Sequence, residues 1–281
     1  MKRNTDNAEV YNYYLNGRFN YHKFTGEGYL TAIKYYDKAL EIEPDHATAL
    51  SALGGVAQEY EWDWEKAGGY YRKSLEIEPN NATFHQWYAE HLAQQGRFDE
   101  ALAEIEVAKQ LDPLALILRV VAGWIYMTAN RPQESIAELE AIIEMDPAWP
   151  GTYLYIDLPY LMVGREKEAV DAMVHYVRLT DRAAVADSVA QAYATGGMAA
   201  YWNAVIDELK RTDRSPGLIG FYFAYAGQPD SAMTYLERAA EERAFPIHVV
   251  AVTQWLRSMH GDPRLQALIE RMKLEHVKPA Y

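Results

Sequence analysis

Small and large apolar residues recur along this chain with a fixed spacing. Counting from Ala32, small residues follow at intervals of 35, 34, 34 and 34, namely Ala67, Ala101, Ser135 and Ala169. Four residues after each of these stands a larger one: Tyr36, Tyr71, Ile105, Leu139 and Met173. Seven residues after the first three stands another small one: Ala39, Ser74 and Ala108. Because positions 0, +4 and +7 share one face of an α-helix, the pattern predicts one such helix in every period.

Each of these helices needs a partner helix to cover its face. Two antiparallel helices approach closely where one presents small side chains, and the large residue then fills the groove between them. Apolar residues at helical spacing in 82–95 and 114–129 supply the partner upstream, and Gly96, Asn130 and Gly164 mark the turn inside each pair. Proline ends the second helix because it cannot donate the next backbone hydrogen bond. The prolines stand in the phrases EIEP, EIEP, QLDP and EMDP, at Pro44, Pro79, Pro113 and Pro147.

The spacing is less regular beyond residue 181. Gly197 and Gly227 continue the series of turns, whereas Trp202 stands where a small residue is expected. The small, large, small face returns at Ala232, Leu236 and Ala239. We predict seven helix pairs, at about 8–44, 46–79, 81–113, 114–147, 148–181, 183–213 and 216–244. Two closing helices are predicted near 247–259 and 263–273, the second opened by Asp262 as cap and Pro263 as first helical residue.

A helix-turn-helix period of 34 residues with this signature resembles the tetratricopeptide repeat. The resemblance implies an all-α fold, a right-handed α-solenoid of about seven helix pairs in residues 1–244. Residues 245–281 would then be capping helices and a short tail, because the end of a solenoid needs a polar element. The function implied is that of a non-catalytic scaffold that binds proteins or peptides in its concave groove.

Four longer phrases carry a narrower resemblance. They are YNYYLNGR (11–18), EWDW (61–64), HQWYAEHLAQQGRFDEAL (85–102) and DPRLQALIERM (262–272). These phrases resemble the C-terminal repeat region of certain bacterial multidomain regulators, in which the repeats follow a winged-helix, nucleotide cyclase or protein kinase domain. This resemblance implies an alternative function, that of a regulatory or oligomerising module of a larger signalling or transcription regulator.

Composition and charge narrow the range of partners. The net charge of −13 is concentrated between Asp37 and Asp112, where 16 acidic and 6 basic residues give −10. We therefore expect no nucleic-acid partner. No apolar run approaches the ~20 residues of a membrane helix, and the first residues contain no apolar signal segment. We therefore expect no membrane partner and a cytoplasmic location, with the periplasm as the alternative. Cysteine is absent, which excludes disulfides, thiolate catalysis and cysteine metal sites.

The sequence contains no motif typical of catalysis. His85 and His91 are six residues apart and lack the i, i+4 spacing of a helical zinc site, and no Gly-rich phosphate loop or GxSxG elbow is present. A carbohydrate-active helical toroid is the enzyme alternative, since seven tryptophans and 22 tyrosines could line a sugar site beside two carboxylates. Many of these rings fall at packing positions, as Tyr36, Tyr71 and Tyr126 do. We therefore expect no enzyme, cofactor or metal.

The predicted binding surface lies on the first helix of each pair, which lines the concave side of such a solenoid. The repeat register places eleven residues there: Tyr14, Arg18, Tyr21, Ser51, Gln58, Gln86, Glu90, Gln94, Trp124, Met127 and Asp157. Most are neutral, aromatic or acidic, so the basic clamp with which some tetratricopeptide domains hold carboxylates looks absent. The expected partner is a protein or peptide with basic and apolar residues.

Asp157 and Pro159 break the local rules of the fifth pair. The carboxylate occupies a position where a small residue is expected, and a proline inside a helix costs ~3 kcal/mol. Broken rules gather at functional sites, which favours a role in binding. The alternative is a kink in which Asp157 accepts hydrogen bonds from backbone amides that the kink exposes.

The first predicted helix is aromatic on more than one side. Its segment VYNYYLNGRFNYHKF contains Tyr11, Tyr13, Tyr14, Phe19, Tyr21 and Phe24. An uncapped apolar end of a solenoid needs cover, which favours an upstream domain or a homo-oligomer contact at this helix. The alternative is that the rings pack on the second helix and on one another.

Overall fold

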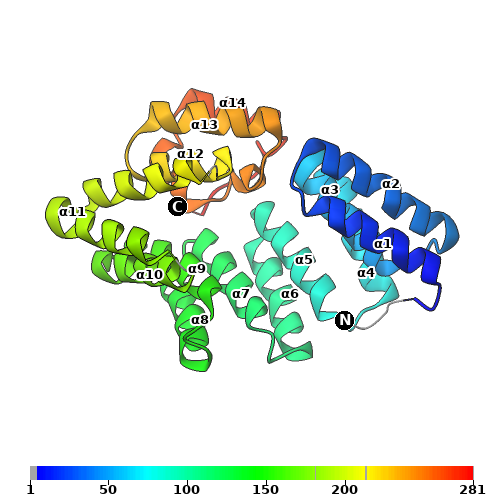
Figure 1. Cartoon of the computed structure of the whole chain (residues 1–281). Helices are drawn as coiled ribbons and strands as arrows, with labels where there is room; N and C mark the ends of the chain where they lie inside the picture. Colours follow the sequence, from blue (N-terminus) through cyan, green and yellow to red (C-terminus); the bar gives the residue numbers. More distant parts are fainter. Residues whose placement is uncertain (1–4, 181, 213, 281) are drawn as a thin grey trace.

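The computed structural model describes residues 5–180, 182–212 and 214–280, and its described residues form helices and connecting turns without strands (Figure 1). The all-helical prediction is therefore confirmed. The elements are α1 (Ala8–Tyr21), α2 (Gly26–Ile42), α3 (Ala47–Val56), the π-helix η1 (Ala57–Glu61), α4 (Trp64–Ile77), α5 (Ala82–Gln94), α6 (Phe98–Leu111), α7 (Leu116–Thr128), α8 (Pro132–Met145), α9 (Pro150–Met162), α10 (Glu166–Leu179), α11 (Ala183–Arg211), α12 (Pro216–Tyr225), α13 (Pro229–Glu242), the 3₁₀ helices η2 (Ile247–Val249) and η3 (Gln254–Met259), and α14 (Pro263–Arg271).

Successive helices pack in pairs, as the small and large positions predict. Leu139 of α8 is fully buried, and a Cβ atom on Gly123 of α7 would lie 2.9 Å from its Cγ. The same relation joins Gly220 of α12 to Leu236 of α13, at 2.8 Å. In these pairs the first helix therefore has a glycine where the large residue of the second helix inserts.

The repeated EIEP, QLDP and EMDP phrases connect one pair to the next. In each phrase the carbonyl of the residue before proline accepts the N–H of the third residue further on. These bonds are His46 to Glu43 (3.0 Å), Asn81 to Glu78 (3.2 Å), Ala115 to Asp112 (3.3 Å) and Trp149 to Asp146 (3.2 Å). Each donor is the N-cap of the next first helix. The phrase thus ends one helix and begins the next within a single turn.

Two segments differ from the predicted helices. α11 contains a break at Gly197, whose φ of 65° lies in the left-handed region, so the predicted turn is present within one long element. The prediction of a single closing helix at 247–259 is wrong, because this segment forms the short 3₁₀ helices η2 and η3. Its sequence VVAVT is rich in β-branched residues, which lose side-chain freedom in an α-helix.

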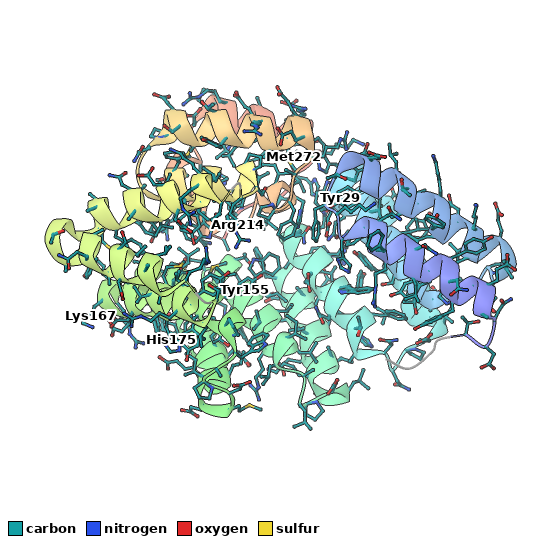
Figure 2. The ribbon with its side chains drawn as sticks, in the orientation of Figure 1. Tyr29, Tyr155, Lys167, His175, Arg214 and Met272 are labelled. Atoms are coloured by element: carbon teal, nitrogen blue, oxygen red, sulfur yellow. The ribbon has the colours of Figure 1, made fainter. Side chains whose placement is uncertain are left out.

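The helix pairs curve until the last elements meet the second pair (Figure 1). The indole N–H of Trp64 donates to the carbonyl of Met272 at 2.9 Å, and the guanidinium of Arg243 lies 4.3 Å from the ring centre of Trp62. Met272 lies at the edge of the C-terminal elements nearest to the N-terminal pairs (Figure 2). Trp62 and Trp64 accordingly belong to the same hydrophobic core as the C-terminal residues. The C-terminal segment therefore contacts the second pair as well as the last one.

The C-terminal segment also reaches the middle pairs. The side-chain amide of Gln254 donates to the carbonyl of Thr128 at the end of α7, at 3.2 Å. His276 Nε2 lies 3.0 Å from the Oε1 atom of Gln95, just beyond α5. The C-terminal segment therefore contacts the C-terminal ends of α5 and α7.

Candidate binding pocket

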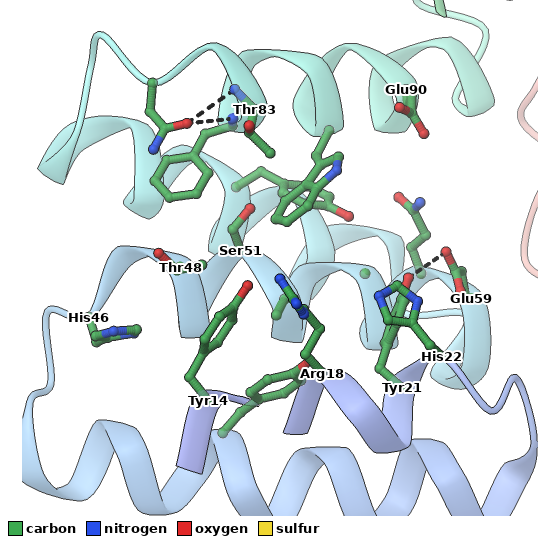
Figure 3. A pocket seen from close by; sticks show the side chains of 18 of the residues that line it. Tyr14, Arg18, Tyr21, His22, His46, Thr48, Ser51, Glu59, Thr83 and Glu90 are labelled. Atoms are coloured by element: carbon green, nitrogen blue, oxygen red, sulfur yellow. Dashed lines mark hydrogen bonds between the residues drawn. The ribbon is translucent and has the colours of Figure 1, made fainter. Parts of the chain in front are cut away.

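A pocket of about 530 Å³ lies between the first helices of the first three pairs, α1, α3 and α5. Figure 3 shows Tyr14 and Arg18 directed from one side toward Ser51, with Glu90 on the opposite wall. The pocket is lined by Tyr11, Tyr14, Arg18, Tyr21, His22, Tyr36, His46, Thr48, Ser51, Ala52, Gly55, Gln58, Glu59, Tyr71, Asn81, Thr83, Phe84, Trp87 and Glu90. Seven of these nineteen residues are Tyr, Phe or Trp, and ten carry polar or charged side chains.

The structure brings part of the predicted binding surface together. Six of the eleven predicted residues line the pocket: Tyr14, Arg18, Tyr21, Ser51, Gln58 and Glu90. Gln86 lies beside them and donates its side-chain amide to Glu90 Oε1 at 2.9 Å. The spacing along α1 and α5 was therefore sufficient to identify one side of each helix.

The other four predicted residues do not line the pocket. Trp124 is half-buried, whereas Gln94, Met127 and Asp157 are 3%, 5% and 1% exposed. The expectation that these three side chains face an open groove is therefore wrong. The C-terminal segment lies against the ends of α5 and α7, near Gln94 and Met127. Asp157 lies close enough to Tyr201 and Tyr222 for its charge to raise the pKa of both hydroxyls.

Several lining residues were missed by sequence reasoning. Trp87 lies one helical turn before Glu90, so the spacing i, i+3 could have identified it. Glu59 follows Gln58 directly, and in a regular α-helix the two would face different directions. Both line the pocket because they belong to the π-helix η1, whose wider turn changes the direction of side chains. The sequence of this segment gives no signal for that change.

One end of the pocket is acidic. Glu59 accepts the hydroxyls of Tyr21 on Oε1 and Tyr29 on Oε2, at 2.7 and 2.9 Å. Burial raises the pKa of Glu59 to about 7, against the lowering effect of these two hydrogen bonds. Burial likewise raises the pKa of Glu90 to about 7, and the negative charge of Glu59 acts in the same direction. The partners of both carboxyls are hydroxyl and amide groups rather than cations.

The other end presents hydrogen-bond donors. His46 is the N-cap of α3, and its Nδ1 atom accepts the N–H of Ala49 at 3.1 Å. Burial lowers the pKa of His46, so the ring is neutral at pH 7 and its proton lies on Nε2. His46 Nε2 and Ser51 Oγ are buried and have no hydrogen-bond partner among the residues that the structure describes. Because buried polar groups are nearly always paired, both are suited to contact a ligand.

No three His, Asp or Glu side chains in 5–180, 182–212 and 214–280 gather as possible metal ligands. Within the same residues, no helix has the length and apolar character that crossing a bilayer requires.

Comparison with known proteins points to one repeat family. A family model described as tetratricopeptide repeat matches residues 61–122, and a second model with the same description matches 29–46 and 118–148. No curated protein sequence matches the chain.

Solved structures with the same fold include three helical proteins. PilW, a type IV pilus biogenesis factor, is 17% identical, with 90% of this chain and 99% of PilW covered and a TM-score of 0.56. The pilF protein of Pseudomonas aeruginosa is 19% identical, with 90% and 97% covered and a TM-score of 0.53. TTC0263, a thermophilic TPR protein of Thermus thermophilus, is 19% identical, with 63% and 98% covered and a TM-score of 0.54. At these identities the similarity shows the fold alone.

Proposed function

Because this chain is a tetratricopeptide-repeat protein, we propose that it is a non-catalytic scaffold that binds a protein or peptide in the pocket between α1, α3 and α5. The observation that carries the proposal is the pocket itself, about 530 Å³ in volume, with aromatic walls and unpaired buried donors. Apolar pockets of this size with a few convergent polar groups are typical of ligand sites. Three successive first helices contribute to it, which suits an extended segment crossing several repeats.

The lining supports a partner with apolar and basic side chains. Rings such as Trp87 and Phe84, whose centres are 6.3 Å apart, offer contact area to apolar groups. Glu59 and Glu90 add negative charge at one end. The surrounding segment from Asp37 to Asp112 carries a net charge of −10, so a basic partner is also attracted at longer range.

Trp87→Ala is expected to weaken peptide binding by on the order of tenfold or more, because central aromatic residues carry much of the energy of an interface. Peptides would be selected from a displayed random library on the immobilised full chain, and their affinities measured by calorimetry. Trp149→Ala is the matched control, since Trp149 is also half-buried but lies at the start of α9, outside the pocket. Both variants would be checked by circular dichroism. Unchanged affinity in a folded Trp87→Ala variant would rule out this pocket.

Self-association through α1 stays a separate prediction. Most of the first-helix rings pack within the chain: Tyr14 is 5% exposed, and Tyr21 meets Tyr29 with ring centres 5.5 Å apart. Phe19, however, is 67% exposed. If α1 forms a dimer contact, the wild-type chain elutes as a dimer in light scattering and Phe19→Ser elutes as a monomer. A monomeric wild type at high micromolar concentration would exclude this contact.

The cytoplasmic location and the role as a module of a larger regulator likewise stay proposals.

A further inference from the structure

The acidic end of the pocket contains two carboxyls, and among the described residues no cation contributes to the pKa of either one. Glu59 comes from η1 and Glu90 from α5, and both are directed to the same pocket (Figure 3). Arg18 also lines the pocket, but its charge acts on Tyr14, Tyr36 and His22. Glu59 raises the pKa of Glu90 through its charge, and an added cation in the pocket would stabilise the charged form of both carboxyls.

The hydrogen bonds already made by the two acids restrict the shape of that cation. Both oxygens of Glu59 accept a tyrosine hydroxyl, and Glu90 Oε1 accepts the amide of Gln86. A guanidinium binds best to two unoccupied oxygens of one carboxylate, through two parallel N–H bonds. An ammonium group is a point charge with three donors and can use single lone pairs from two different acids. The arrangement therefore favours lysine over arginine.

The rest of the pocket fits the remainder of a lysine residue. Tyr21, Tyr71 and Trp87 line it and can cover the aliphatic stem, since lysine buries its methylene groups against apolar surface. The unpaired donors His46 Nε2 and Ser51 Oγ are neutral and suit a main-chain carbonyl of the same peptide. Because Glu59 and Glu90 are acidic and the unpaired donors are neutral, the lysine ammonium is expected beside the two carboxyls.

We propose that Glu59 and Glu90 form an ammonium subsite that selects peptides with a lysine side chain at one position. The proposal rests on the proposed peptide-binding function and assigns the residue type that this end of the pocket recognises. Lysine is preferred over arginine, and neutralising the amine removes the recognition.

The test uses four libraries of N-acetylated, C-amidated hexapeptides that are identical except at one fixed position. That position holds lysine, arginine, acetyl-lysine or norleucine, the last of which keeps the stem and lacks the amine. The amount of each library retained by the immobilised full chain is measured by mass spectrometry. The lysine library is expected to be enriched about tenfold over norleucine and acetyl-lysine, and several-fold over arginine. A fifth library with norleucine at this position and a free N-terminal amine shows whether a terminal ammonium is taken instead of a side chain, which would overturn the lysine assignment.

Variants connect the preference to the two acids. The Glu59→Gln/Glu90→Gln double variant is expected to retain the norleucine library and to lose the preference for lysine. Glu90→Gln alone is expected to reduce the preference for lysine. This single variant disturbs only the bond to Gln86 and keeps the hydrogen bonds of Glu59, so it serves as the test if the double variant does not fold. Glu140→Gln is the matched control, because Glu140 also accepts a tyrosine hydroxyl, that of Tyr160 at 2.9 Å, outside the pocket.

The pH dependence gives an independent readout. Glu59 accepts the hydroxyls of Tyr21 and Tyr29, and its charge raises the pKa of Tyr36, Tyr71 and Glu90. Glu90 accepts the amide of Gln86, and its charge raises the pKa of Tyr71 and Tyr155. With a pKa of about 7 the carboxyls are mainly protonated at pH 6 and ionised at pH 8. The preference for lysine over norleucine should therefore fall by about tenfold from pH 8 to pH 6.

The two proposals fail in different ways. If none of the libraries is retained by the wild-type chain, the peptide-binding function itself is wrong. If all libraries are retained equally and the glutamine variants change nothing, the function stands and the ammonium subsite is wrong. Equal retention of lysine and arginine with loss of both in the double variant would keep a cation site and overturn its preference for lysine.

Discussion

Trp64→Ala is expected to lower the free energy of unfolding by about 3–5 kcal/mol, the usual cost of truncating a buried tryptophan. Trp64 is 7% exposed and shares a core with Met272 and Leu274, which are fully buried. Its indole N–H also bonds to the carbonyl of Met272, and that acceptor would lose its partner. Urea denaturation followed by circular dichroism measures the loss.

The same variant should release the C-terminal segment locally. Trp64 is separated from Met272 by 208 residues along the chain, so the contact between them closes the curve of helix pairs rather than stabilising one pair. Amide hydrogen exchange in residues 272–278 is therefore expected to become faster in Trp64→Ala, whereas exchange in α8 and α9 should change little. Trp64→Phe keeps most of the apolar contact and should show a smaller loss, of about 1–2 kcal/mol. Wild-type protection of 272–278 in the alanine variant would contradict the closing role of Trp64.

The helix pairs could be predicted because the signals for them are local. The residues at 0, +4 and +7, the turn at Gly164 and the proline at the end of each pair all act within one period of the chain. Gly164 adopts the left-handed φ of 79° that its place in the turn requires. Nothing local indicates that Trp62 and Trp64 pack against elements about 200 residues later. The EWDW phrase looked like part of a repeat, and its contacts depend on the curvature accumulated over all the pairs.

The pocket could be predicted in part for the same reason. Tyr14, Arg18 and Tyr21 follow helical spacing on α1, and Glu90 follows it on α5, so their common side can be read from the sequence. The π-helix that directs Glu59 into the pocket is a change of backbone register without a sequence signal here. Gln94 and Met127 have the correct register, but their helix ends meet the C-terminal segment.

The burial of Asp157 favours a structural role over the binding role that its place in the sequence suggested. It lies in α9 at the position occupied by Gly123 in α7, and it is 1% exposed. Its Oδ1 atom accepts the backbone N–H of Leu158 at 2.7 Å, while Oδ2 has no hydrogen-bond partner within 5–180, 182–212 and 214–280. Burial raises the pKa of Asp157 to about 7. An ionised carboxylate at this place is therefore unfavourable.

Asp157→Asn is expected to stabilise the protein at pH 8 and to have little effect at pH 4. Below the unfolded-state pKa of 3.8 the carboxyl is protonated in both states, so it costs nothing by ionisation. Between pH 4 and pH 7 the unfolded chain ionises first, and folding loses about 1.4 kcal/mol per pH unit. The accumulated loss is roughly 4 kcal/mol at pH 8, and asparagine avoids it because its amide does not titrate.

Thermal unfolding of both chains between pH 4 and pH 8 measures this difference, which corresponds to about 10 °C in Tm at pH 8. Other groups titrate in the same range, among them Glu59 and Glu90, so the comparison is between variant and wild type at each pH. If the difference in Tm between variant and wild type is constant across pH, or if the variant is less stable at pH 8, the loss of stability with rising pH does not come from Asp157. Since Asp157 does not line the pocket, the peptide affinity of the variant should equal that of the wild type. A large loss of affinity in a more stable variant would instead support the binding role that the sequence suggested.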